Sequence, residues 1–214
     1  MGIFYFPCDF VYWRNINEHD HLRKQLLDQI ETKQELFSKT AYIDKGVGTV
    51  GKSLGLWIIE DNPTIIKTIV WDSLDILIKE MNSRPNCKSI DITNSFISNC
   101  WFIKYDSGAT TSIHCHGDDN PAIIKDDNKL YKCMFSFIYI LNDNNEKNQT
   151  EFIQPSMAGT TVSESRDTRF KTSEVEDIRE GAIIIFPSNL YHQVNIMYKP
   201  NRVVFSGNIY STFE

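Results

Sequence analysis

Histidine side chains that could bind a metal ion occur at two distant places in the sequence. His114 and His116 are separated by one residue, and His192 lies far downstream. Two side chains one residue apart on a β-strand point to the same side of the sheet, so a second strand could bring the third imidazole to them. Neutral imidazole nitrogens bind divalent transition metals. The spacing therefore indicates a metal site built by two strands.

An arginine and two small polar residues follow His192 on what reads as the last strand. Arg202 stands ten residues after His192 and is followed by the apolar run 203–205. Ser206 and Asn208 alternate with Arg202 along this strand and therefore share its face. A guanidinium group binds a carboxylate through two parallel hydrogen bonds. An arginine in this setting indicates recognition of a buried carboxylate, and the alternative is an ordinary ion pair at the surface.

The order of these residues resembles that of the iron- and 2-oxoglutarate-dependent oxygenases. The resemblance covers about residues 99–210. Within this family, the sequence is similar to a phage- and bacteria-rich branch that often carries His-x-His. The residues that carry it are Trp101, Tyr105, Gly108, His114-x-His116-Gly117, Gly181, Phe186-Pro187-Ser188, His192 and Arg202-x-x-x-Ser206-x-Asn208.

The resemblance implies a role for each residue at the site. His114 and His192 would bind Fe(II), and Arg202 would hold the far carboxylate of 2-oxoglutarate. Ser206 would be a second donor to that carboxylate, and further cosubstrate contacts would come from Tyr105, Tyr139 and Asn208. The implied reaction uses O2 and hydroxylates a substrate while 2-oxoglutarate is oxidatively decarboxylated to succinate.

The third metal ligand has two candidates. In relatives a Tyr stands nine positions before the first ligand, and Tyr105 and His114 reproduce this spacing, which puts His116 where an Asp is expected. His116-Gly117-Asp118 is itself a literal His-x-Asp, shifted by two residues. We favour His116, which gives a catalytic set of three histidines, and Asp118 stays the alternative ligand. Asp118 or Asp119 could otherwise hold a histidine ring in one tautomer.

The composition is that of an ordinary globular chain. With 214 residues, of which 41% are hydrophobic and 23% charged, the chain can bury a sizeable core. The net charge of −6 disfavours nucleic acid as the main ligand because phosphate backbones are also negative. The five cysteines form no Cys-x-x-Cys and are typical of reduced thiols, so we expect a cytoplasmic, reducing location. No signal peptide and no apolar run long enough for a membrane is recognisable.

Hydrophobic periodicity predicts two helices in the first part of the chain. Leu22, Leu26 and Ile30 recur at helical spacing, which predicts a helix over about 18–37. A second helix is expected from Asn62-Pro63 to about residue 82, because proline is well tolerated at the first helical position. The aromatic-rich segment 3–13 reads as one extended strand.

Short β-type runs alternate with turn residues beyond residue 83. They cover 99–105, 111–116, 134–141, 149–155, 182–187, 192–198 and 202–210. Strands of this number and length predict a sandwich or barrel, and a jelly roll is one solution. Two polar stretches, 117–132 and 156–180, interrupt the strands and are either lids over a site or mobile surface loops.

One motif points to a different chemistry. Residues 46–53, Gly-Val-Gly-Thr-Val-Gly-Lys-Ser, match the P-loop pattern literally. That motif binds phosphates when a buried strand precedes it and a helix follows it. Here residues 54–59 read as another strand, and no alternating strand and helix units follow. We therefore do not assign nucleotide binding.

The sequence thus predicts a mainly β (α+β) chain with a double-stranded β-helix, or jelly-roll, core and N-terminal helices packed on one sheet. We expect a single domain over 1–214, with 1–83 as a supporting strand and helices and 84–214 as the catalytic core. The implied function is an Fe(II)- and 2-oxoglutarate-dependent oxygenase whose substrate is a protein or peptide or a small molecule. The alternatives are a non-catalytic jelly-roll binding protein and a three-His metal dioxygenase that does not use 2-oxoglutarate.

Overall fold

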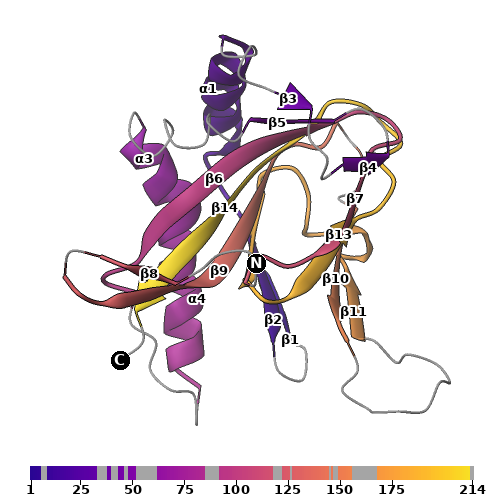
Figure 1. Cartoon of the computed structure of the whole chain (residues 1–214). Coiled ribbons are helices and arrows are strands. Elements are labelled where there is room, and N and C mark those ends of the chain that lie inside the picture. The colour runs from indigo at the N-terminus through magenta and orange to yellow at the C-terminus, as the bar shows by residue number, and fades with distance from the viewer. Residues whose placement is uncertain are drawn as a thin grey trace, which may run out of the picture.

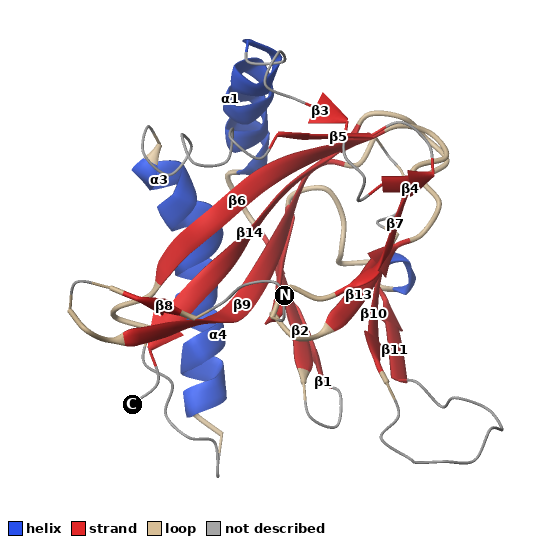
Figure 2. Cartoon of the chain, viewed as in Figure 1, coloured by secondary structure: helices blue, strands red, loops and turns tan. Residues whose placement is uncertain are grey.

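Two antiparallel β-sheets and a layer of helices form the computed structural model of this protein (Figure 1, Figure 2). The structure describes residues 1–5, 9–32, 38–39, 43–45, 48–51, 62–84, 92–117, 122–125, 127–144, 146, 149–155 and 168–212. The helices lie on the side of the larger sheet that faces away from the smaller sheet (Figure 2). The prediction of a mainly β chain with helices packed on one sheet is confirmed.

The larger sheet has the strand order β1-β2-β12-β9-β14-β6-β5-β3, with β8 paired to β9. The long strand β14 lies between β9 and β6 and pairs with both along most of its length. Such a central strand has its backbone hydrogen bonds satisfied on both edges, which makes it a rigid support for side chains. The strands are β1 (Gly2–Tyr5), β2 (Phe10–Asn15), β3 (Ser38–Lys39), β5 (Gly48–Gly51), β6 (Phe96–Tyr105), β8 (Ile123–Ile124), β9 (Leu130–Asn142), β12 (Ala182–Pro187) and β14 (Arg202–Thr212).

The smaller sheet has the order β11-β10-β13-β7-β4. Its strands are β4 (Ile43–Lys45), β7 (Thr110–His114), β10 (Thr150–Gln154), β11 (Thr168–Lys171) and β13 (Tyr191–Val194). On β13, His192 is the register partner of His114 on β7 and of Phe152 on β10. Register partners on neighbouring strands share one face of a sheet, so the smaller sheet brings His114 and His192 together.

Several segments differ from the sequence prediction: the polar stretch 117–132 contains β8 and the start of β9, and the strand expected over 192–198 ends at Val194. The segment 3–13 is not one strand, because β1 and β2 form an antiparallel pair in which Gly2 lies opposite Trp13. The polar stretch 156–180 contains β11 and a short 3-10 turn, η3 (Thr172–Glu174), and β11 extends the smaller sheet by pairing with β10. A strand of four residues with one large apolar side chain gives too weak an alternation to be recognised.

Helical segments cover the larger sheet as predicted. They are α1 (His19–Thr32), then α3 (Pro63–Ile66), the π-helical turn η2 (Lys67–Trp71) and α4 (Asp72–Asn82) in direct succession. The buried side chains of α1 are Leu22, Leu26 and Ile30, and those of α4 include Leu74 and Leu77. Residues 33–37 of the first predicted helix lie outside the described ranges. No helix within the described ranges is long and apolar enough to cross a membrane.

The P-loop-like motif does not form a phosphate-binding loop in its described part. Gly48–Gly51 form β5, which pairs with β6 so that Gly48 lies opposite Tyr105 and Gly51 opposite Phe102. A strand inside a sheet has its N–H groups directed to a neighbouring strand rather than gathered around an anion. The remaining positions of the motif, 46–47 and 52–53, lie outside the described residues.

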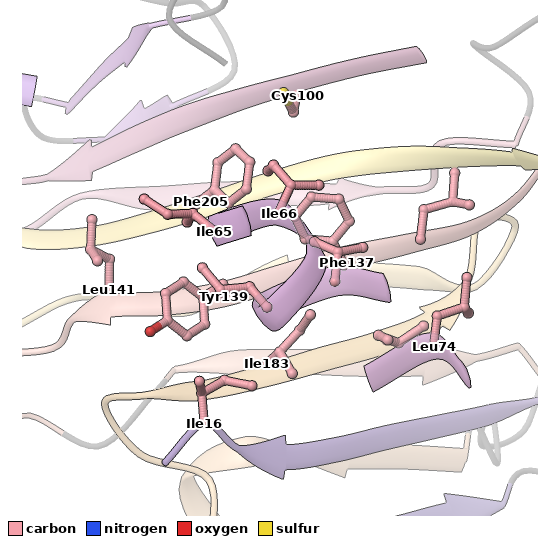
Figure 3. Close-up of a cluster of buried hydrophobic side chains, with 14 of the residues drawn as sticks. Ile16, Ile65, Ile66, Leu74, Cys100, Phe137, Tyr139, Leu141, Ile183 and Phe205 are labelled. Atoms are coloured by element: carbon pink, nitrogen blue, oxygen red, sulfur yellow. The ribbon is translucent and has the colours of Figure 1, made fainter. Parts of the chain in front are cut away.

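The side chains of β14 alternate between two cores. Val203, Phe205 and Ile209 belong to the core between the larger sheet and the helices. Figure 3 shows Phe205 in this core, near Ile65 and Ile66. Val204 belongs to the core between the two sheets, with residues such as Phe152. Because side chains two apart on a strand share a face, Arg202, Ser206 and Asn208 lie on the side of Val204, between the sheets. The candidate site residues of β14 are therefore on the same side as the histidines of the smaller sheet.

Gly207 on β14 has no room for a side chain. A Cβ atom there would lie 2.7 Å from Cε1 of Phe137 and 2.8 Å from Cβ of Cys100. We expect Gly207→Ala to lower the free energy of unfolding by about 1–3 kcal/mol, measured by urea denaturation, because overpacking displaces neighbours in a dense core. Adding Phe137→Leu should recover part of the loss in a double-mutant cycle. Additive effects of the two changes would contradict this steric explanation.

Candidate metal centre

Three histidine side chains meet between the two sheets. The potential ligand atoms of His114, His116 and His192 all lie within 4.8 Å of one another. The ring centroids are 4.3 Å apart for His114 and His192, 5.0 Å for His116 and His192, and 5.2 Å for His114 and His116. Within the part of the chain that the structure describes, this is the one group of three or more His, Cys, Asp or Glu side chains placed to hold a metal ion.

The turn between β12 and β13 fixes the position of His116, which lies two residues beyond the end of β7. The backbone N–H groups of His116 and Gly117 both donate to the carbonyl of Ser188, at 2.7 and 2.9 Å. The N–H of Ser188 donates in turn to the carbonyl of Met134 on β9 at 3.1 Å. A Cβ atom at Gly117 would lie 3.3 Å from the Cα of Asn189, so the two segments are in close contact. His116 is thereby held against the larger sheet.

Hydrogen bonds fix the tautomer of two of the rings. Nδ1 of His114 lies 2.8 Å from the carbonyl oxygen of Ser112. Nδ1 of His192 lies 3.2 Å from the carbonyl oxygen of Leu190. A carbonyl oxygen can only accept a hydrogen bond, so each of these Nδ1 atoms carries the proton. The Nε2 atoms of both rings are then left with the lone pair that a metal ion needs.

The third ring is held by side chains of the larger sheet. Nδ1 of His116 lies 2.8 Å from Oδ1 of Asn208 and 3.0 Å from Oγ of Ser136. The Ser136 hydroxyl donates to the same Asn208 oxygen at 2.7 Å, so both groups present lone pairs to the ring. All three imidazoles therefore share one arrangement, with Nδ1 as a donor to oxygen and Nε2 available as a ligand.

The surroundings favour the neutral form of His192, which is 4% exposed. Burial lowers the pKa of His192, and the nearby His114 and His116 lower this pKa further. The rings of Phe186 and Phe152 lie 4.9 and 5.9 Å from its ring and form an apolar wall. A metal ion binds the neutral imidazole, so this environment prepares the ring for ligation.

Acid is expected to destabilise the metal-free protein as the pH falls below about 6.5, the ordinary pKa of histidine. There the unfolded chain binds a proton at position 192, whereas the folded protein resists it because the pKa of His192 is lowered. The folding constant should fall by up to about tenfold per pH unit from this group. Thermal unfolding from about pH 7.5 to about pH 5.5 should show a shallower dependence for His192→Gln. An identical pH dependence of thermal unfolding in both proteins would contradict the lowered pKa of His192.

Arg202 is a buried cation on β14, with 1% of its surface exposed. Its guanidinium carbon lies 4.9 Å from the ring centroid of Tyr105, and its Nη2 donates to Oγ1 of Thr150 at 3.4 Å. Burial lowers the pKa of Arg202, while Tyr105, Asp143 and Glu146 act in the opposite direction. An arginine stays protonated at neutral pH even when its pKa is lowered. A positive charge is therefore present between the sheets.

Strand register relates this cation to the histidines. Thr150, which accepts from Arg202, is the register partner of Val194, two residues beyond His192 on β13. Thr111, whose hydroxyl lies 3.1 Å from the phenol beside the guanidinium, is also paired with Val194. Two residues along a strand span about 7 Å and keep the same face. The guanidinium therefore contacts a residue of the smaller sheet that lies about one such step along the strands from the level of His192.

The other predicted site residues on β14 have different surroundings. Ser206 is 4% exposed and pairs with Trp101 on one side and Ile138 on the other, between Arg202 and Asn208 on the same face. Asn208, expected as a cosubstrate contact, instead binds the ring of His116.

Asp118, the alternative metal ligand, lies outside the described residues.

Tyr139 is not brought to this site, and its prediction as a cosubstrate contact is corrected. Its side chain lies in the core on the helix side of the larger sheet, beside Phe137 and Phe205 (Figure 3). Its hydroxyl lies 2.7 Å from Nδ1 of His19 on α1. Residues 135, 137 and 139 share one face of β9, so Tyr139 points away from the space between the sheets.

Ser136 was missed by the sequence analysis although it contacts His116. It stands on the opposite face of β9 from Phe135 and Phe137, opposite Asn208 on β14. The available signal was a small hydroxyl residue inside an otherwise aromatic and aliphatic strand. A buried hydroxyl requires a hydrogen-bond partner, which makes such a position a candidate for support of a site.

No family model and no curated protein matches this sequence. Solved structures do match it. The non-haem alpha-ketoglutarate-dependent epimerase SnoN from nogalamycin biosynthesis has a TM-score of 0.60 at 9% identity, over 94% of this chain and 77% of that chain. HygX from Streptomyces hygroscopicus, solved with nickel and 2-oxoglutarate bound, has a TM-score of 0.53 at 10% identity, over 96% of this chain and 83% of that chain.

A protein-modifying enzyme has a similar fold. The prolyl hydroxylase from Trichoplax adhaerens, in complex with a hypoxia inducible factor peptide fragment, has a TM-score of 0.53 at 14% identity, over 92% of this chain and 82% of that chain. At these identities the likeness concerns the fold. The chain has the jelly-roll fold of the 2-oxoglutarate- and iron-dependent oxygenases, and the fold prediction is confirmed.

Proposed function

We propose that this protein is an Fe(II)- and 2-oxoglutarate-dependent oxygenase of the hydroxylating type, with His114, His116 and His192 as its metal ligands. The observation that carries the proposal is the meeting of three imidazoles whose Nδ1 atoms all face oxygen acceptors. This donor set fits iron, because imidazole nitrogen suits Fe(II). Fold neighbours with Fe3+ or nickel and with the oxo acid bound give further support.

The cosubstrate would bind between the metal centre and Arg202. The guanidinium would hold the far carboxylate through two parallel hydrogen bonds, and the buried hydroxyl of Ser206 would be a second donor. Tyr105 would position the guanidinium through the contact between its ring and the cation. Burial makes such charge-assisted bonds stronger than they are in water.

When bound, Fe(II) and 2-oxoglutarate supply the oxidising chemistry. The balanced reaction converts O2, 2-oxoglutarate and a substrate C–H group into succinate, CO2 and a hydroxylated product, with one oxygen atom entering succinate and the other the product. The protein's residues hold the ligands and keep water away, since the aromatic rings of Phe152 and Phe186 line the inner side of the site. His114 is the least buried of the three histidines, so the substrate would approach on its side.

A second candidate is a three-His metal dioxygenase that does not use 2-oxoglutarate. It is favoured by the described ligand cluster, which contains no carboxylate. The buried Arg202 supports the first candidate, because 2-oxoglutarate always brings a second carboxylate for a guanidinium, whereas the second candidate would need a substrate that carries one.

An anaerobic titration of the Fe(II)-loaded protein with 2-oxoglutarate tests the proposal. We expect the weak visible absorption band of the metal chelate to appear and saturate, and succinate to form when O2 is admitted. Iron binding without this band, in protein that consumes O2 with another substrate, would favour the second candidate. A band without any succinate across a substrate panel would favour a binding protein.

A further inference from the structure

By the sequence resemblance, His116 stands where an iron site of two histidines and one carboxylate is expected to have an acidic residue. We propose that Asn208 and Ser136 are positioning residues that make His116 a neutral ligand binding through Nε2, and that this pair directs the site toward metals that prefer nitrogen. This inference rests on the proposed function, because it takes His116 as a metal ligand.

The groups around Nδ1 of His116 are hydrogen-bond acceptors, which fits an imidazole that donates from this atom. Oδ1 of Asn208 receives the Ser136 hydroxyl at 2.7 Å and faces Nδ1 of His116 at 2.8 Å. Since the hydroxyl proton of Ser136 points to Asn208, the lone pairs of its oxygen face the ring at 3.0 Å. Both neighbours therefore accept, and the ring must donate from Nδ1. The Nε2 atom is then the free ligand.

Burial enforces this arrangement. Ser136 is fully buried, Asn208 is 1% exposed and His116 is 9% exposed, so water cannot easily replace a lost partner. A ring turned to present Nε2–H would leave buried acceptors without a donor, which costs more than an exposed hydrogen bond would. The ring of Trp101 is also close, with its centroid 5.4 Å from that of His116, and leaves the imidazole less room to rotate.

The pair also lies on two hydrogen-bonded strands in the interior of the larger sheet. Ser136 and Asn208 are register partners on β9 and β14, which are adjacent central strands of the larger sheet. Positioning groups on paired strands hold a ligand more accurately than groups on loops. His116 itself follows the end of β7, where backbone hydrogen bonds to Ser188 hold its main chain, and the pair fixes the orientation of its ring.

A carboxylate in place of His116 would face hydrogen-bond acceptors, whereas it needs donors. Two acceptor oxygens would face its negative charge unless the Asn208 amide turned over and the Ser136 hydroxyl rotated. Imidazole ligands suit iron, cobalt, nickel and zinc, whereas carboxylates suit manganese and magnesium. The structure therefore points to a site that binds Co(II) or Zn(II) in strong preference to Mn(II).

The test combines ring tautomers with metal affinity. In the metal-free protein, 15N NMR of the histidine rings at slightly alkaline pH should show His116 protonated at Nδ1. Asn208→Leu should lose this tautomer and lower the Co(II) affinity by about 10- to 100-fold. Asn99→Leu is the matched control, because Asn99 is the exposed register partner of Asn208 on β6, and it should change neither quantity.

Substitutions by aspartate separate a positioning role from a structural role. Asn208→Asp keeps the acceptor and should retain Co(II) binding in the His116 protein. His116→Asp alone should raise the Mn(II) to Co(II) affinity ratio at least about tenfold, because a carboxylate then replaces an imidazole ligand.

Two results would overturn the inference. One is wild-type His116 protonated at Nε2, and the other is wild-type Co(II) affinity in folded Asn208→Leu. Should Asn208→Leu not fold, the wild-type tautomer and the milder Ser136→Ala variant decide. Failure of the proposed function is distinguishable, since a protein that binds Co(II) with the expected tautomer but never binds 2-oxoglutarate would refute the oxygenase alone.

Discussion

Replacing His192 with alanine is expected to lower the affinity for Co(II) or Zn(II) by more than about a hundredfold, which exceeds the effect of removing an outer-sphere partner. Two imidazoles would remain, and neither could move to replace a ligand fixed on β13 opposite His114. Succinate formation should fall to background. Isothermal titration of the metal-free protein with Zn(II) measures the affinity directly, so the result does not depend on knowing the substrate.

The variant should nevertheless fold. Phe152 and Phe186 stay in the core around position 192, and the metal-free protein gains nothing from three close imidazoles. His21→Ala is the matched control, because His21 is exposed on α1, and it should bind Zn(II) like the wild type. Full Zn(II) affinity in folded His192→Ala would remove the metal centre as described.

The same measurement decides between the two candidate third ligands. We expect His116→Ala to lose Zn(II) affinity as His192→Ala does, and Asp118→Asn to keep it. The reason is that His116 lies within the ligand cluster and has a partner that fixes its tautomer. The opposite pair of results would assign the third ligand to Asp118.

Alternation along strands made much of this site predictable. His192 and Arg202 were found because each stands in or beside a run of apolar residues typical of a buried strand. Applied to β9, the same rule puts Tyr139 on one face with Phe137 and Ser136 on the other face with Ile138. Which face meets the other sheet and which meets the helices is a tertiary property, and alternation alone does not tell the two buried faces apart.

The third ligand could not be decided from spacing for a similar reason. His116 lies beyond the last residue of β7, where the two-residue period no longer applies. Its place depends on the carbonyl of Ser188, which is distant in sequence. The hairpin of β1 and β2 had a local signal, because Pro7 lies between the two strands and proline interrupts a central strand.

Replacing Arg202 with methionine is expected to raise the dissociation constant for 2-oxoglutarate at least about thirtyfold, because removing one partner of a buried charge pair costs about 2–5 kcal/mol. Zn(II) affinity should stay unchanged, since the guanidinium contacts a residue of the smaller sheet about one strand step from the level of His192. Arg202→Lys should be intermediate, because it keeps the charge and loses the two-pronged geometry.

The physical basis of this expectation is the separation of metal binding from cosubstrate binding. Methionine fills a similar volume, so thermal unfolding of Arg202→Met should still be cooperative. Arg169→Met is the matched control, because Arg169 lies on β11 with 47% of its side chain exposed and pairs with Glu151 away from the histidines. Wild-type 2-oxoglutarate affinity in Arg202→Met would make the guanidinium a structural group. The far carboxylate of 2-oxoglutarate would then be bound by groups other than Arg202.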